Sequence, residues 1–114
     1  MIAKLMGLDT IAPKELQRLV AGGAVSVFDV NSPQSWMQAR VPGAVNLDPI
    51  TYAPSDLPSD KNAILVFYCS NPWCRKAPNA ARRAAGMGYG NARVMPAGIK
   101  GWMGAKLPVE SGPA

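Results

Sequence analysis

The chain of 114 residues contains no histidine and only two cysteines, Cys69 and Cys74. Without an imidazole, neither a Ser-His-Asp triad nor a Cys-His pair is available for catalysis. Two thiols also supply too few of the ligands that zinc requires, so we expect neither a metal nor another cofactor. Two cysteines this close in the sequence suit redox or sulfur chemistry, in which the thiols themselves react.

Long apolar runs are also missing, although 48% of the residues are hydrophobic. No run approaches the roughly 20 residues that a membrane-spanning helix needs. Residues 1–7 lack the apolar segment of a secretory signal, and Asp9 follows closely. These absences predict a cytoplasmic protein that does not bind membranes. The length predicts one globular domain, residues 1–114.

Acidic residues are scarce: seven Asp and Glu stand against twelve Lys and Arg, which gives a net charge of +5. Several basic residues follow the cysteines closely, namely Arg75, Lys76, Arg82, Arg83 and Arg93. This charge favours small anions or an acidic protein surface as partners. Nucleic acid is not expected, because aromatic residues are not interleaved with the charges and no nucleic-acid-binding motif occurs.

The clearest candidate for a catalytic segment is an apolar run that ends at Cys69. Residues 63–68 are almost entirely apolar, which is typical of a parallel strand buried on both faces. Pro78 fits only the first turn of a helix, so the Ala-rich helix that follows should begin at Lys76 or Ala77. Cys69 would then face a helix N-terminus, where backbone N–H groups and the helix dipole favour a thiolate nucleophile.

The rest of the chain alternates helical and strand-like segments. Residues 10–13 are expected to open a helix that begins at Thr10 and has Pro13 in its first turn, and Ser32 should cap a second helix with Pro33 in its first turn. Residues 98–102 should begin a terminal helix, and residues 48–62 should form a surface connection. Strands are predicted at 24–30, 45–47, 63–68 and 93–95. The alternation predicts an α/β fold, with a mostly parallel central sheet and helices on both faces.

Five segments, taken in order along the chain, resemble the single-domain rhodanese (sulfurtransferase) family. They are residues 11–16, Phe28-Asp29-Val30, Trp36 through Pro42-Gly43-Ala44 and Asn46, Tyr68-Cys69, and a closing block at 98–102 and 107–110. The resemblance covers nearly the whole chain. It implies the rhodanese-like three-layer fold and an active-site loop that begins at Cys69.

The chain also departs from the family pattern. Asn31 stands where arginine usually follows Asp-Val, Ala39-Arg40 replaces the usual Gly-His pair, and Ala97 replaces the first glycine of the closing block. The common family loop reads Cys-x-x-Gly-x-Arg-Ser, whereas Arg75 lies six positions after Cys69. This Cys-x5-Arg spacing resembles the loops of rhodanese-fold phosphatases and arsenate reductases, and it implies a wider cradle that accepts a tetrahedral oxyanion.

The resemblance implies that Cys69 takes a sulfane sulfur from thiosulfate or a persulfide donor, carries it as a persulfide and passes it to a thiol or cyanide. The residues that follow are expected to bind the substrate: Ser70, Asn71, Pro72, Trp73, Cys74, Arg75 and Lys76. Their backbone N–H groups would hold the anion. Arg75 suits an oxyanion through its fork of donors, with a solvated first-turn arginine as the alternative.

For some of the other residues the sequence allows both a functional and a structural role. Cys74 is either a resolving thiol that forms a disulfide with Cys69, or a small apolar side chain packed under the loop. Trp73 is expected to pack on the domain, with an exposed partner contact as the alternative. Asp29 is expected to make structural hydrogen bonds, and Trp36 and Trp102 are expected to be packing anchors.

Two other functions compete with sulfur transfer. One is that of a Cys-x5-Arg oxyanion enzyme: arsenate reduction would use Cys69 with Cys74 or an external thiol. A phosphatase would need a general acid, and residues 70–74 contain none. The other is that of a non-catalytic rhodanese-like regulatory or binding module, although such modules often lack the cysteine that this chain keeps. Sulfur transfer is the preferred hypothesis.

Overall fold

The computed structural model describes residues 7–113. Within them, five short strands form one sheet in which every neighbouring pair is parallel. The spatial order is β1-β5-β4-β2-β3. The strands are β1 (Asp9–Thr10), β2 (Ser26–Asp29), β3 (Val45–Asn46), β4 (Leu65–Tyr68) and β5 (Ala92–Val94). The predicted α/β fold with a parallel sheet is confirmed, and β4 lies at its centre.

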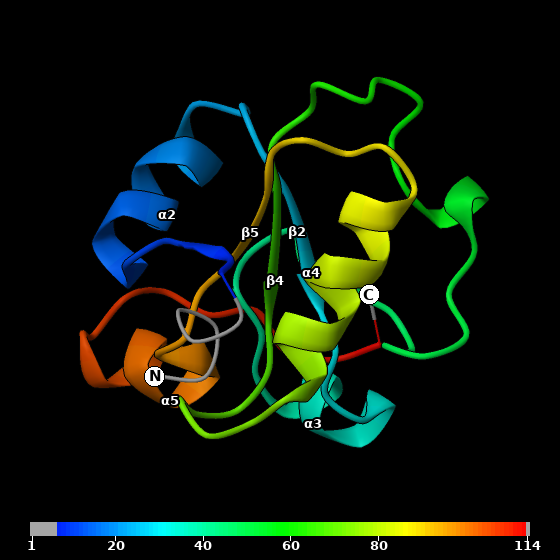
Figure 1. Cartoon of the computed structure of the whole chain (residues 1–114). Coiled ribbons are helices and arrows are strands. Elements are labelled where there is room, and N and C mark those ends of the chain that lie inside the picture. The colour runs from blue at the N-terminus through cyan, green and yellow to red at the C-terminus, as the bar shows by residue number, and fades with distance from the viewer. Residues whose placement is uncertain (1–6, 114) are drawn as a thin grey trace.

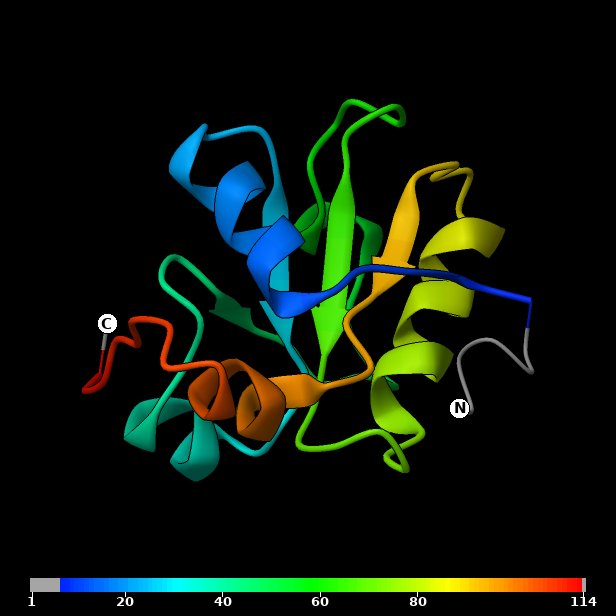
Figure 2. The ribbon, with the colours of Figure 1, turned by 90° about the vertical axis from the view of Figure 1, so that its left-hand side faces the viewer.

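Helices cover both faces of this sheet. Figure 1 shows the sheet nearly edge-on, with α4 on one face and with α2 and α5 on the other. Figure 2 looks onto the face that α2 and α5 cover. The helices are α2 (Pro13–Ala21), α3 (Pro33–Gln38), α4 (Lys76–Gly86) and α5 (Gly98–Gly104), and a 3-10 turn, η1, spans Pro54–Asp56. The arrangement is the predicted three-layer architecture.

The side chains of β4 alternate between two cores. Leu65 and Phe67 belong to the core under α4, whereas Val66 and Tyr68 belong to the core under α2 and α5. All four residues are fully buried, as expected for a central parallel strand covered on both faces. Trp102 of α5 is also fully buried, which confirms its predicted packing role.

Local sequence signals place most element boundaries correctly. Pro13 begins α2, and the Ser32 hydroxyl accepts a hydrogen bond from the Ser35 N–H at the start of α3. The prediction that Thr10 opens a helix is wrong, because Thr10 belongs to β1 and pairs with Val94 of β5. A strand of two residues is too short to leave a periodic pattern in the sequence.

Helix α4 presents a face of alanines to the sheet. Ala77, Ala80, Ala81 and Ala84 are buried against the core that contains Phe67. Because alanine is small, the helix lies close to β4. Its first residue, Lys76, is one of the two helix starts that the sequence predicted. This packing holds the N-terminus of α4 next to the segment that leaves β4.

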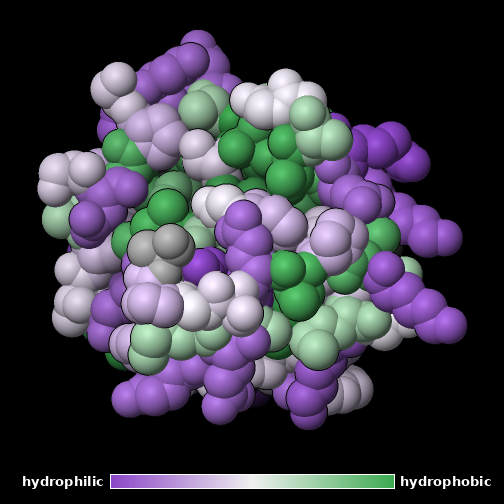
Figure 3. All heavy atoms as spheres, turned by 180° about the vertical axis from the view of Figure 1, so that it is seen from behind, coloured by the Kyte–Doolittle hydropathy of each residue, from purple (hydrophilic) through white to green (hydrophobic). Residues whose placement is uncertain are grey.

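The surface of the described part carries separate apolar side chains. Seen from behind, apolar patches lie between hydrophilic ones (Figure 3). The two most exposed large apolar residues are Ile50, at 75%, and Trp73, at 74%. None of the helices within residues 7–113 has both the length and the apolar composition needed to cross a bilayer.

Candidate active site

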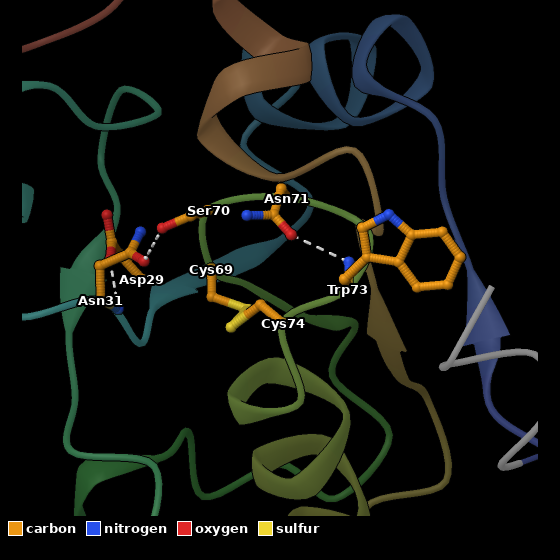
Figure 4. The surroundings of a disulfide bond; sticks show 7 residues. All are labelled: Asp29, Asn31, Cys69, Ser70, Asn71, Trp73 and Cys74. Carbon is orange, nitrogen blue, oxygen red and sulfur yellow. Dashed lines mark hydrogen bonds between the residues drawn. A yellow bond between two sulfur atoms is a disulfide. The ribbon is translucent and has the colours of Figure 1, made fainter.

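Cys69 lies immediately after β4, at the carboxyl end of the central strand. Its side chain is buried, with 3% exposure. Residues 70–75 form a loop that ends where α4 begins at Lys76. Figure 4 shows Cys69 between the end of β4 and the N-terminal turn of α4, the position that the sequence predicted for the nucleophile.

The two cysteines of the loop are joined. The Sγ atoms of Cys69 and Cys74 form a disulfide, and their Cα atoms are 6.4 Å apart (Figure 4). This separation lies within the usual range for disulfides. Cys74 is half-buried and also packs against the core under α4. The sequence left disulfide formation and packing as alternatives for Cys74, and the structure combines them.

The loop curls around Asn71. The Trp73 N–H donates to the Asn71 side-chain Oδ1 at 2.9 Å, and the Cys74 N–H donates to the Asn71 carbonyl at 3.2 Å. These two N–H groups therefore point at Asn71. The N–H groups of Ser70 and Arg75 have no acceptor among residues 7–113. In the disulfide form, the predicted cradle is only partly free to bind an anion.

The predicted packing of Trp73 on the domain is wrong. Its side chain is 74% exposed and points away from the disulfide (Figure 4). The Asn71 turn fixes the Trp73 backbone, so the indole projects outward from the loop. Pro72 is exposed beside it.

A hydrogen-bonded chain ties the start of the loop to the neighbouring strand. The Ser70 hydroxyl donates to Asn31 Oδ1 at 2.8 Å. The Asn46 side-chain amide of β3 donates to the Asn31 carbonyl at 2.9 Å. Asn31 is buried, with 8% exposure. Asn31, which stands where the family usually has arginine, therefore holds Ser70 in place through this hydrogen bond. No signal in the sequence indicated this role.

Asp29 is fully buried beneath this chain. Its carboxylate accepts hydrogen bonds from the Tyr68 hydroxyl at 2.7 Å and from the Asn31 N–H at 2.8 Å. Burial raises the pKa of Asp29 above its ordinary value, and these hydrogen bonds partly oppose the rise. Burial also raises the pKa of the Tyr68 phenol, which in turn accepts from the Val41 N–H at 3.0 Å. The predicted structural role of Asp29 is confirmed.

Helix α5 clamps the other side of the loop start. The Ile99 N–H donates to the Cys69 carbonyl at 2.9 Å, and the Lys100 N–H donates to the Ser70 carbonyl at 3.2 Å. Gly98 makes this approach possible: its φ is +64°, and a Cβ there would lie 2.5 Å from the carbonyl carbon of Ser70. The closing block recognised in the sequence therefore carries a positioning function for Cys69.

Positive charge lies where the loop meets α4. Arg75 and Lys76 are exposed there. Arg83, by contrast, donates to the Tyr52 carbonyl at 2.7 Å, and Arg93 lies in β5, at the strand position in register with Asp9 of β1. Of the five basic residues predicted near the cysteines, Arg75 and Lys76 are therefore the two that lie in the loop and at the first residue of α4.

Arg40, which replaces the family histidine, is buried, with 3% exposure. Its guanidinium donates to the Gly112 carbonyl at 2.7 Å, lies 4.0 Å from the centre of the half-buried Trp36 ring, and approaches Glu110 at 3.8 Å. Trp36 in turn donates from Nε1 to the Ala44 carbonyl at 2.9 Å. Arg40 therefore holds the C-terminal segment against the domain and takes no part in the loop.

Two hollows adjoin the loop. One lies beneath it, against Cys69, Cys74 and Pro78, and has a volume of about 10 Å³. That is room for about one water molecule. The second, of about 310 Å³, is lined by Asn31, Asp48, Ile50 and Lys76 among others. With the disulfide formed, an anion or an acceptor molecule therefore has space beside the loop and not beneath it.

Comparison with known proteins agrees with this fold. Residues 12–105 match the model of the rhodanese-like domain. An HTH-type transcriptional regulator of Mycobacterium tuberculosis is 32% identical over 106 residues, which cover 91% of this chain and 46% of the regulator. This chain thus spans about half the length of that relative.

A more distant relative is an enzyme of similar length. The human thiosulfate:glutathione sulfurtransferase is 26% identical, and the alignment covers 87% of this chain and 96% of that protein. Among solved structures, a Bacillus halodurans protein superimposes with a TM-score of 0.82 at 21% identity, covering 96% of this chain and 80% of that one. By its match to the domain model, its fold and its relatives, the chain belongs to the family of rhodanese-like domains.

Proposed function

We propose that this chain is a rhodanese-type sulfurtransferase, which moves a sulfane sulfur from thiosulfate or a persulfide donor to a thiol or cyanide through a Cys69 persulfide. The observation that carries the proposal is the position of Cys69: a buried sulfur at the carboxyl end of the central strand, facing the N-terminus of α4. Such a setting favours a thiolate and a bound anion. The similarity to a human sulfurtransferase supports the same assignment.

The reaction begins once the Cys69–Cys74 disulfide has been reduced. The Cys69 thiolate attacks the sulfane sulfur of thiosulfate, a new S–S bond forms, and sulfite leaves with the electrons of the broken bond. An acceptor thiolate or cyanide then attacks the outer sulfur of the persulfide, which restores the Cys69 thiolate. Each step is an exchange at sulfur and needs no other oxidant or reductant.

The loop residues have distinct parts in this scheme. Arg75 and Lys76 attract the doubly charged donor to the mouth of the loop. The N–H groups of Ser70 and Arg75, which have no acceptor within residues 7–113, are available for the negative charge on the terminal sulfur. The α5 clamp and the Asn31 hydrogen bond hold Cys69 and Ser70 in place for attack.

The test is thiocyanate formation by reduced protein supplied with thiosulfate and cyanide. We expect Cys69→Ser to abolish the reaction. Ser111→Ala, in the exposed C-terminal segment far from the loop in sequence, serves as the control and should behave as the wild type. Thiocyanate formation that survives in Cys69→Ser would contradict the proposal.

Arsenate reduction is a second candidate, and the disulfide is the observation that favours it. Arsenate bound at Cys69 would be reduced to arsenite by two electrons as Cys69 and Cys74 form their disulfide, so the electrons balance. Arsenite release from arsenate by reduced protein, without thiocyanate formation from thiosulfate, would favour this activity. A rhodanese-like module without catalysis, as part of a longer regulator, predicts neither product.

A further inference from the structure

We infer that Cys74 is an internal acceptor, and that the Cys69 persulfide releases its sulfur as hydrosulfide when Cys74 attacks it. This inference rests on the proposed function, because it begins from the same persulfide. It adds a sulfide-releasing activity to sulfur transfer. It also makes the Cys69–Cys74 disulfide a product of the catalytic cycle.

The first argument is geometric. The disulfide shows that the Cys74 sulfur reaches the Cys69 Sγ atom itself, with Cα atoms 6.4 Å apart (Figure 4). In a persulfide, this atom is the inner sulfur, and the transferred sulfur lies about 2 Å further out. Attack at the inner sulfur expels the outer one, whereas attack at the outer sulfur would pass it on. Cys74 is placed to attack the inner sulfur, and this attack releases the outer sulfur.

The second argument is that the loop is built to keep Cys74 there. The carbonyl and the side chain of Asn71 accept hydrogen bonds from the Cys74 and Trp73 N–H groups, which curls the loop back toward Cys69. Cys74 also packs against the core under α4. An internal thiol held in this way has a high effective concentration relative to any external thiol.

The third argument is access. Cys69 is 3% exposed, and the hollow beside the two sulfurs has a volume of only about 10 Å³. In this arrangement an external thiol finds little room at the Cys69 sulfur, whereas the Cys74 sulfur is in contact with it.

The step balances without another reactant. The Cys74 thiolate attacks the Cys69 Sγ, the bond between the two cysteine sulfurs forms, and the bond to the outer sulfur breaks. The outer sulfur leaves with the electron pair as hydrosulfide, so it is reduced by two electrons while the two thiols are oxidised to the disulfide. A dithiol reductant then returns the protein to its reduced form. Its target is Cys74, since that side chain is the more exposed of the pair.

The experiment is a single turnover of reduced wild-type protein with thiosulfate, with no added thiol or cyanide. We expect sulfite and sulfide in equal amounts, one of each per chain, together with conversion of the protein to its disulfide form. The rate should not depend on protein concentration, because the attack is intramolecular. Sulfite release with the extra sulfur retained on the protein and no sulfide would overturn the inference and leave the proposed function standing. Absence of sulfite would overturn both.

Two variants sharpen the test. Cys74→Ser should stop after sulfite release, with the added sulfur retained on Cys69 and no sulfide formed. The double variant Trp73→Cys with Cys74→Ser keeps a thiol in the loop, but at a position whose side chain points away from Cys69 (Figure 4). It should behave like Cys74→Ser. Sulfide release by either variant in amounts equal to sulfite would contradict the assignment of Cys74.

Discussion

At the scale of single residues, the position of the nucleophile depends on groups that do not react. Gly98 allows α5 to approach the Cys69–Ser70 backbone, and Asn31 holds the Ser70 hydroxyl. The Asp29 carboxylate accepts a hydrogen bond from the Asn31 N–H and so helps to hold Asn31 in place. The reactive cysteine is thus fixed from two sides by neighbours that belong to different elements.

Substitution of Gly98 by alanine should destabilise the protein. The added Cβ would clash with the Ser70 backbone, and the φ of +64° is unfavourable for alanine. We expect a loss of about 2 kcal/mol or more in the free energy of unfolding, measured by urea denaturation. Gly104→Ala, at the other end of α5 with no atom within 4 Å of its added Cβ, is the control and should change stability by less than about 1 kcal/mol. Equal effects of the two variants would contradict the clamp.

Asp29 should leave a signature in the pH dependence of stability. Burial raises its pKa in the folded state above the ordinary value of 3.8, so the folded protein binds this proton more tightly than the unfolded chain does. The wild type should therefore lose stability relative to Asp29→Asn as pH rises from 3.8 through the raised pKa, and the difference should then level off. Denaturation of both proteins across this range checks the sign. A difference that grows in favour of the wild type as pH rises would contradict it.

At the scale of elements, α4 does two things at once. Its alanine face lets it lie close to the sheet, and its N-terminus thereby reaches the Cys69 loop. The Tyr52 hydroxyl, which donates to the Ala80 carbonyl at 2.7 Å, fastens the connection between β3 and β4 to the same helix. Packing and chemistry therefore depend on the same small side chains.

Enlarging that face should separate the helix from the sheet. Ala80→Leu places a larger side chain at a fully buried position, and we expect it to lower the free energy of unfolding by about 1 to 3 kcal/mol. Asn79→Leu, the neighbouring exposed position, is the matched control and should have little effect. Chemical denaturation compares the two. If Ala80→Leu were as stable as the wild type, the close contact between α4 and β4 would be contradicted.

Sequence reasoning performed best where one residue type has one physical consequence. Pro78 predicted the start of α4, and the apolar run before Cys69 predicted the central strand. Strand β1 was missed because two residues show no period. The outward direction of Trp73 depends on a side-chain hydrogen bond within the loop, which no pattern of residue types reveals.

The joining of the two cysteines could not be decided from their spacing. A loop of this length can bring two thiols together or hold them apart, and the curl around Asn71 determines which occurs. The role of Asn31 was likewise hidden, because it arises from a partner, Ser70, that lies 39 positions away in the sequence. Contacts of this kind follow from the strand order, which places β2 beside β4.

At the scale of the whole molecule, the strand order places the reactive residue. β4 is the central strand, so Cys69 leaves the sheet between the ends of β2 and β5, with α4 on one side and α5 on the other (Figures 1 and 2). The net charge of +5 favours anionic donors overall, and Arg75 and Lys76 direct this preference to the loop.

Mass spectrometry of the reduced Cys74→Ser variant, after exposure to thiosulfate and removal of the donor, shows whether Cys69 carries sulfur. This variant lacks the internal acceptor, so the persulfide should persist. We predict one additional sulfur atom on the peptide that contains Cys69, which cyanide removes as thiocyanate. An unchanged mass, or the same gain of sulfur in a variant that also carries Cys69→Ser, would show that Cys69 does not carry the sulfur.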